Sequence, residues 1–307
     1  MRAAGCARGT RPGRRSRKAD AMRLPSPATL AVAGIPYNTL VVTVAMAAVG
    51  LTAGVVGCFG VLRRRALVGD AAAHATLPGI AAAFAITGLR DLPVLLAGAA
   101  ASAAVAMGVL VGLRRFTRTR DDAATAVVIG VSFGMGVAAI SALVARSVPG
   151  SGGLERFLLG ATASLSSADA GLLVAVSAVV LGLTVAIRKE ATVVAFDPAF
   201  AAAAGWPVGR IDGLLVGLTA AMVVVALPAV GAVLVTALVV IPPVAARQWT
   251  DRVGVMLAVA GLFGLVSAVA GVAVSGFVPR LATGPTVVLA AAGLLVVSLV
   301  ARMARAR

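Results

Sequence analysis

The sequence is poor in the residues that soluble proteins use most for chemistry. Of 307 residues, only 11 are Asp or Glu, 12% are charged and 4% are aromatic, with two cysteines and one histidine. This scarcity of charge excludes an ordinary soluble domain, in which about a quarter of the residues are charged. Few aromatic side chains leave no stacking surface for nucleic acid, despite a net charge of +16. Cys6 and Cys58 have no metal-binding spacing.

The chain is instead rich in long apolar runs. Hydrophobic residues make up 60% of it and the mean hydropathy is +1.04. Helices of about 20 apolar residues cross a membrane, because lipid offers the backbone no hydrogen-bond partner. We therefore predict an all-α, polytopic membrane helix bundle with eight or nine transmembrane helices. The spans expected are 38–62, 66–88, 93–113, 124–145, 170–187, 212–227, 229–246, 253–277 and 284–301. The sixth and seventh form one run, divided at Pro228 because proline removes a helix hydrogen bond.

Lys and Arg predict the orientation of these spans. One set of alternate connections, with the C-terminal end, holds fifteen of them and the opposite set holds four. The positive-inside rule places the richer set of connections, and the C-terminus, in the cytoplasm. We expect the protein in the inner (plasma) membrane of the cell. Nine spans put residues 1–37, a basic segment expected to be disordered, outside. That location would require the basic residues of this segment to cross the membrane. A translation start at Met22 removes most of them; alternatively, the number of spans is wrong by one. The permease domain is then 38–307.

Asp70 and His74 are the candidate functional pair. His74 is the only histidine, and it follows Asp70 by four residues, so both lie on one helix face. A carboxylate beside an imidazole suits Mn, Zn or Fe, and His74 lies roughly 13 Å beyond Arg65, deep in the membrane. Alternatively, Asp70 caps the helix or pairs with an arginine of 63–65, and His74 bonds a neighbouring helix. One such pair cannot complete a coordination sphere, so a second copy or another helix must add ligands.

A second candidate lies between the fifth and sixth spans. Asp197 followed by Pro198 is typical of a helix start, and Gly205 of a helix end, which predicts a short cytoplasmic helix near 197–205. Phe196 and Phe200 give this helix an apolar side. It is either a surface helix resting on the lipid interface or a docking element for a cytoplasmic partner.

No phosphate-binding G-x-x-x-x-G-K-[S/T] motif is present, and we expect no enzymatic activity and no permanently bound cofactor. Several motifs, in order, resemble those of the ABC-3 family, the membrane permeases of bacterial manganese, zinc or iron importers. They are Val61 to Arg64 with Gly69, Asp70, His74 and Leu77-Pro78-Gly79; Phe157 to Gly160; Lys189-Glu190 with Phe196-Asp197-Pro198 and Ala201 to Gly205; Gly231 to Leu238 with Ile241-Pro242 and Ala246-Arg247; and Thr283-Gly284.

The resemblance implies a permease that imports a divalent metal along a route lined by Asp70 and His74. It implies a separate cytoplasmic ATPase, an extracytoplasmic metal-binding lipoprotein that faces the 146–169 loop, and a permease homodimer. The short helix would be the coupling helix, with ATPase-binding residues Glu190, Phe196, Asp197, Phe200, Ala201 and Gly205. Two alternatives remain open: a stand-alone ion-coupled secondary transporter in which Asp70 and His74 titrate, and a purely structural membrane subunit.

Overall fold

The computed structural model describes residues 37–88, 91–146, 165–277 and 283–305. The chain divides into two compact units, Met1–Leu40 and Val41–Arg307, and every contact discussed below lies within the second unit. Each regular element in the described ranges is a helix. They are α1 (Tyr37–Leu62), α2 (Val68–Thr87), α3 (Leu92–Phe116), α4 (Asp121–Ala145), α6 (Ser167–Ala186), α7 (Arg188–Phe196), α8 (Pro198–Ala203), α9 (Val208–Val230), α10 (Ala232–Arg247), α11 (Val253–Phe277) and α12 (Thr283–Arg305).

The predicted all-α membrane bundle is confirmed, and nine of these helices coincide with the nine predicted spans. Seven helices in the described part of the chain are long and apolar enough to cross a membrane. The exceptions are α10, which has only 16 residues, and α2, whose hydropathy is lowered by Asp70 and His74. The basic residues 1–36 and most of the 146–169 loop lie outside the described residues.

One predicted boundary is wrong. The sixth span does not end at Pro228, because α9 continues through this proline to Val230. A membrane helix tolerates an internal proline where neighbouring groups satisfy the freed backbone. The chain turns instead at Gly231, whose φ of 85° is open to glycine but strained for other residues. The Gly231 amide donates to the carbonyl of Leu227 at 2.8 Å, which closes α9.

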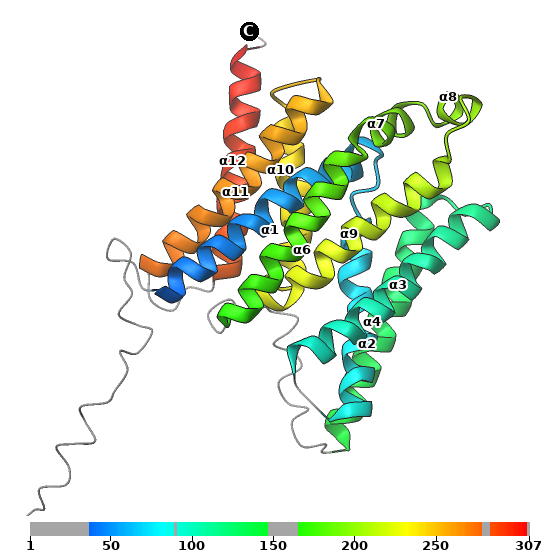
Figure 1. Cartoon of the computed structure of the whole chain (residues 1–307), viewed down its shortest axis with the longest axis vertical. Coiled ribbons are helices and arrows are strands. Elements are labelled where there is room, and N and C mark those ends of the chain that lie inside the picture. Colours follow the sequence, from blue (N-terminus) through cyan, green and yellow to red (C-terminus); the bar gives the residue numbers. More distant parts are fainter. Residues whose placement is uncertain (1–36, 89–90, 147–164, 278–282, 306–307) are drawn as a thin grey trace, which may run out of the picture. The chain divides into compact units, whose positions relative to one another are not determined.

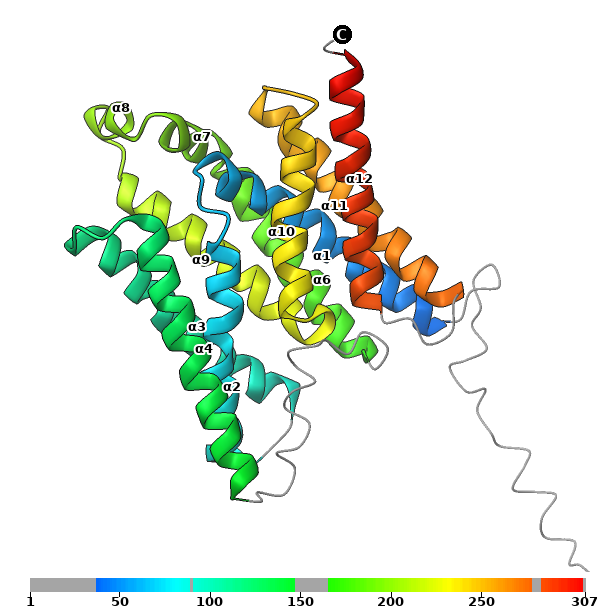
Figure 2. The same ribbon diagram turned by 180° about the vertical axis from the view of Figure 1, so that it is seen from behind.

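The helices pack in two groups around α9. On one side α2 packs against α3 and α4, and on the other α10 packs against α11 and α12. Between them, α9 contacts α2, α3, α6, α7 and α10. Figures 1 and 2 show the same grouping from opposite sides. The α3–α4, α7–α8 and α10–α11 connections and the C-terminal end of α12 face the upper and right parts of Figure 1. We call this end, which carries most of the arginines, the basic end.

The connection between α1 and α2 is unusually tight. The amide of Arg65 donates to the carbonyl of Gly60 at 2.8 Å, and that of Arg64 donates to Val61 at 3.1 Å. These two bonds form a Schellman motif, which requires a left-handed residue just beyond the helix end. Arg64 occupies that position with a φ of 55°, a conformation that glycine adopts without strain. The chain then turns back, so that α2 begins inside the bundle (Figure 1).

Candidate functional site

Asp70 and His74 lie together on the first turns of α2, as the four-residue spacing predicts. The His74 Nε2 atom is 3.5 Å from the Asp70 Oδ1 atom, and the side chains are 25% and 37% exposed, respectively. Two ligands of one tetrahedral metal ion, each bonded at about 2.1 Å, stand about 3.4 Å apart. The observed separation therefore allows one ion to contact both side chains with little movement.

The other nitrogen of His74 is unused. Its Nδ1 atom is buried and has no hydrogen-bond partner among the described residues. The imidazole ring instead packs edge-on against Phe133 of α4, with the ring centroids 5.1 Å apart. A buried polar atom without a partner is costly in a structural residue. Packing thus orients the ring, with Nε2 toward the Asp70 carboxylate and Nδ1 without a hydrogen-bond partner in the described residues.

Two structural alternatives for Asp70, a helix cap and a pairing with Arg63 or Arg65, are not seen in the described residues. The residue that precedes α2 is Leu67, and no side chain caps the helix there, so Asp70 is not an N-cap. Arg63 and Arg65 pair with carboxylates other than that of Asp70. No group of three His, Cys, Asp or Glu residues suited to a metal ion occurs in the described ranges. The described part of one chain therefore supplies a two-residue ligand set.

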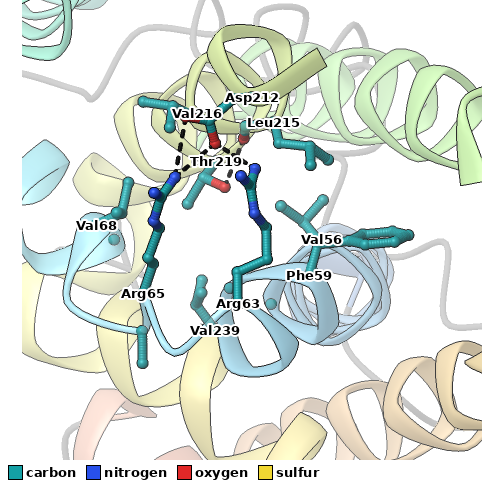
Figure 3. Close-up of a pocket in the computed structure, with 14 residues that line it drawn as sticks. Val56, Phe59, Arg63, Arg65, Val68, Asp212, Leu215, Val216, Thr219 and Val239 are labelled. Carbon is teal, nitrogen blue, oxygen red and sulfur yellow. Dashed lines mark hydrogen bonds and ion pairs between the residues drawn. The ribbon is translucent and has the colours of Figure 1, made fainter. Parts of the chain in front are cut away.

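A partly buried ionic network surrounds the α1–α2 connection, a few residues before this pair, and its carboxylates are absent from the sequence-based predictions. Asp212, in the first turns of α9, accepts from the guanidinium groups of both Arg63 and Arg65 (Figure 3). The Arg65 Nη1 atom is 2.7 Å from Oδ1 and 2.9 Å from Oδ2 of Asp212. The side chains of Arg63 and Asp212 are only 11% and 18% exposed. Burial lowers the pKa of the Arg63 guanidinium, and the adjacent Asp212 carboxylate opposes that shift.

The network continues to α3 and α4. The Arg65 Nε atom donates to Asp121 Oδ2 at 2.7 Å, and Asp121 also lies 3.5 Å from the Arg114 Nε atom. Three arginines therefore share two carboxylates, which join the α1–α2 connection to the ends of α3, α4 and α9. The sequence offered one signal for it: Asp212 is an acidic residue at the start of a long apolar run.

The short helix at the basic end forms as predicted. Asp197 caps α8 by accepting from the amide of Phe200 at 2.8 Å, and Gly205 follows the helix end with a φ of 83°. Ala201 is buried and anchors the helix, whereas Phe196 and Phe200 are 60% and 62% exposed. Glu190, on α7, has one buried carboxylate oxygen without a hydrogen-bond partner in the described part. Two large apolar side chains of this segment, Phe196 and Phe200, are thus presented to the outside.

Together, the apolar helices, the carboxylate–imidazole pair inside the bundle and the short helix at the basic end define a multi-pass membrane transport permease. The chain belongs to the ABC 3 transport family, whose model matches residues 37–302.

Three similar proteins illustrate the relationship. The chain is 41% identical to the zinc transport system membrane protein TroC of Treponema pallidum, over 81% of this chain and 84% of that protein. It is 38% identical to the manganese transport system membrane protein MntC of Bacillus subtilis, over 86% of this chain but 60% of the length of MntC. Its fold matches that of PsaBC from Streptococcus pneumoniae, solved in complex with a Fab, with a TM-score of 0.73 and 28% identity over 85% of this chain and 91% of that one.

Proposed function

We propose that this protein is the permease subunit of an ABC importer for a divalent transition metal, manganese or zinc, and that Asp70 and His74 bind the ion in transit. The observation that carries the proposal is the 3.5 Å approach of the His74 Nε2 atom to the Asp70 carboxylate inside a helix bundle. The names of the relatives TroC and MntC, a zinc and a manganese transport protein, support the choice of metals.

The two side chains provide what a travelling cation needs. A metal ion that leaves water loses its hydration shell, and the protein must replace those ligands. The Asp70 carboxylate supplies negative charge, and the His74 imidazole supplies a nitrogen that manganese, zinc and iron all accept. Two ligands bind an ion weakly enough for it to move on. A second copy of the chain would double the set to four, which suits a tetrahedral site.

The energy source in this proposal is a separate ATPase at the basic end, and a lipoprotein at the opposite end delivers the metal. The exposed Phe196 and Phe200 side chains fit a docking role, because large apolar groups at a polar surface mark contact sites. Asp197 and Gly205 fix the ends of the helix that presents them. Membership of the ABC 3 transport family favours this mechanism over a stand-alone transporter driven by an ion gradient.

The test separates transport from assembly. Asp70→Asn removes the charge and His74→Ala removes the nitrogen, and each should abolish accumulation of manganese and zinc while the ATPase still co-purifies. Phe200→Ala should instead weaken binding of the ATPase, so that it no longer co-purifies. An aromatic side chain buried in an interface contributes about 2 kcal/mol or more to binding. Asp251→Asn is the matched control, since its carboxylate is 96% exposed at the same end of the bundle.

Metal accumulation is measured in cells limited for one metal at a time, and assembly by affinity purification of the tagged permease. Wild-type accumulation in both the Asp70 and His74 variants would remove them from the transport route. Accumulation by an ATPase-deficient strain would overturn the ABC mechanism and restore the secondary-transporter alternative.

A further inference from the structure

We infer that Asp212 is a positioning residue that links movement of α8 and α9 to the metal-binding turn of α2. The inference rests on the proposed function, because it assumes that a partner at the basic end drives transport. It assigns a role to the Asp212 network that neither the sequence motifs nor the metal-binding pair requires.

The covalent route from the docking helix to Asp212 is short. The last residue of α8 is Ala203, and α9 begins at Val208, so Asp212 lies only one turn into α9. The packing of α7 and α8 against α9 strengthens this connection. A helix transmits displacement along its axis because its backbone hydrogen bonds make it stiff. A push on the exposed face of α8 therefore reaches Asp212 first.

From Asp212 the route passes to α2 through two guanidinium groups. Residues two apart on a helix point in nearly opposite directions and cannot both reach one carboxylate. The left-handed conformation of Arg64 breaks the helix between Arg63 and Arg65, and both side chains then converge on Asp212 (Figure 3). A strained residue persists where the surroundings hold it, and such residues gather at switch regions. The left-handed conformation of Arg64 is therefore what allows Arg63 and Arg65 to contact the same carboxylate.

Arg65 is connected to the metal-binding turn of α2 by a backbone hydrogen bond. The Arg65 carbonyl accepts from the amide of Val68, the first residue of α2, at 3.2 Å, and Asp70 is two residues further on. Arg65 is also bonded to Asp121 of α4, the helix whose Phe133 packs on the His74 ring. The network thus holds both members of the pair, Asp70 through the start of α2 and His74 through α4.

A variant that keeps the shape and removes the charge tests this role. In the complete importer reconstituted in liposomes, with Mn²⁺ and Zn²⁺ supplied separately, Asp212→Asn should lower uptake by about tenfold or more, the size of a typical coupling between sites. Hydrolysis of ATP by the same complex should remain near the wild-type rate. Asp251→Asn, at an exposed ion pair on the same end of the bundle, should change neither activity.

Exchange of the two charged residues tests whether Asp212 couples α9 to α2 or only stabilises the fold. The double variant Arg63→Asp with Asp212→Arg rebuilds the ion pair between positions 63 and 212, whereas Arg65 loses its two bonds to Asp212 and keeps only Asp121. It should recover uptake relative to either single variant. If Asp212→Asn lowers uptake and ATP hydrolysis in the same proportion, or has no effect on uptake, Asp212 does not link the two elements.

Movement is measured directly with pairs of spin labels after Cys6 and Cys58 are replaced. One pair joins Ile86 on α2 to Val296 on α12, and the other joins Leu214 on α9 to Val296; all three side chains are exposed. A non-hydrolysable ATP analogue should change both distances in the wild type and only the Leu214 distance in Asp212→Asn. A change of both distances in Asp212→Asn overturns the inference. A wild-type complex in which neither distance responds would refute the ATP-driven function itself, and the link with it.

Discussion

Removal of the Asp212 carboxylate should be costly because it strands a buried cation. In the variant Asp212→Leu, Arg65 keeps Asp121 at 2.7 Å, whereas Arg63, 11% exposed, loses the only carboxylate with which it pairs in the described part of the chain. Loss of one partner of a buried ion pair costs about 3–5 kcal/mol, and the partial exposure of this pair argues for the lower value, roughly 3 kcal/mol. For a chain of this size, about 2 °C per kcal/mol predicts a melting temperature lower by about 6 °C.

The same reasoning predicts that a second substitution restores stability. Arg63→Met alone should cost about 1 kcal/mol, because Asp212 still has Arg65. The double variant Arg63→Met with Asp212→Leu leaves no stranded charge, since Arg65 retains Asp121. It should therefore melt near the temperature of Arg63→Met, which corresponds to an interaction energy of about 3 kcal/mol in the double-mutant cycle. Restored stability without restored metal uptake would further separate positioning from folding.

Labelling of Cys58 measures the melting temperature of these variants. Cys58 is a free cysteine buried in the bundle, so a thiol-reactive fluorophore labels it only when the detergent-solubilised protein unfolds, once Cys6 has been replaced by serine. Asp251→Leu removes a pair whose carboxylate is 96% exposed and should change the midpoint little, because exposed ion pairs contribute about 0–1 kcal/mol. If the double variant melts as low as the sum of the two single changes predicts, the charges do not depend on each other and the reasoning fails.

Two further predictions concern the backbone. Arg64→Gly should raise the melting temperature by about 2 °C, because it relieves roughly 1 kcal/mol of left-handed strain, and Arg64→Val should lower it; the reverse order would contradict the assigned turn. Gly264→Leu should lower the melting temperature by about 2–6 °C, since its Cβ would overlap the backbone of Gly50 on α1, and overpacking costs about 1–3 kcal/mol. Gly130→Leu, in open space, is the control, and an equal loss there would remove packing as the cause.

The sequence predicts the parts of this molecule that depend on local spacing. Apolar runs of the right length predict the nine long helices. The four-residue interval between Asp70 and His74 places both on one face of α2, and Asp197 with Pro198 predicts the start of α8. Each of these depends on residues within one or two helical turns, where geometry is nearly independent of the rest of the fold.

The features that the sequence did not predict depend on residues far apart in the chain. Asp212 and Arg65 are separated by 147 positions, and no local pattern predicts that they meet. Arg63–Arg65 enter the sequence analysis as positive charges, as part of a family motif and as possible partners of Asp70, whereas two of the three pair with Asp212 in the structure. Pro228 favours a helix end because proline lacks an amide N–H, yet the break lies at Gly231, where the backbone has a positive φ.

The separation between Arg65 and Asp212 also has a consequence for biosynthesis. During translation, Arg63 and Arg65 emerge just before α2, a helix whose apolar character is lowered by Asp70 and His74. Asp212, the carboxylate that contacts both arginines, is synthesised 147 residues after Arg65. Because Asp121 follows Arg65 by only 56 residues, Arg65 gains its first ion pair once α4 has been made. Arg63 has no ion-pair partner in the described ranges until Asp212 follows, so the complete network forms only after more than two thirds of the chain has been made.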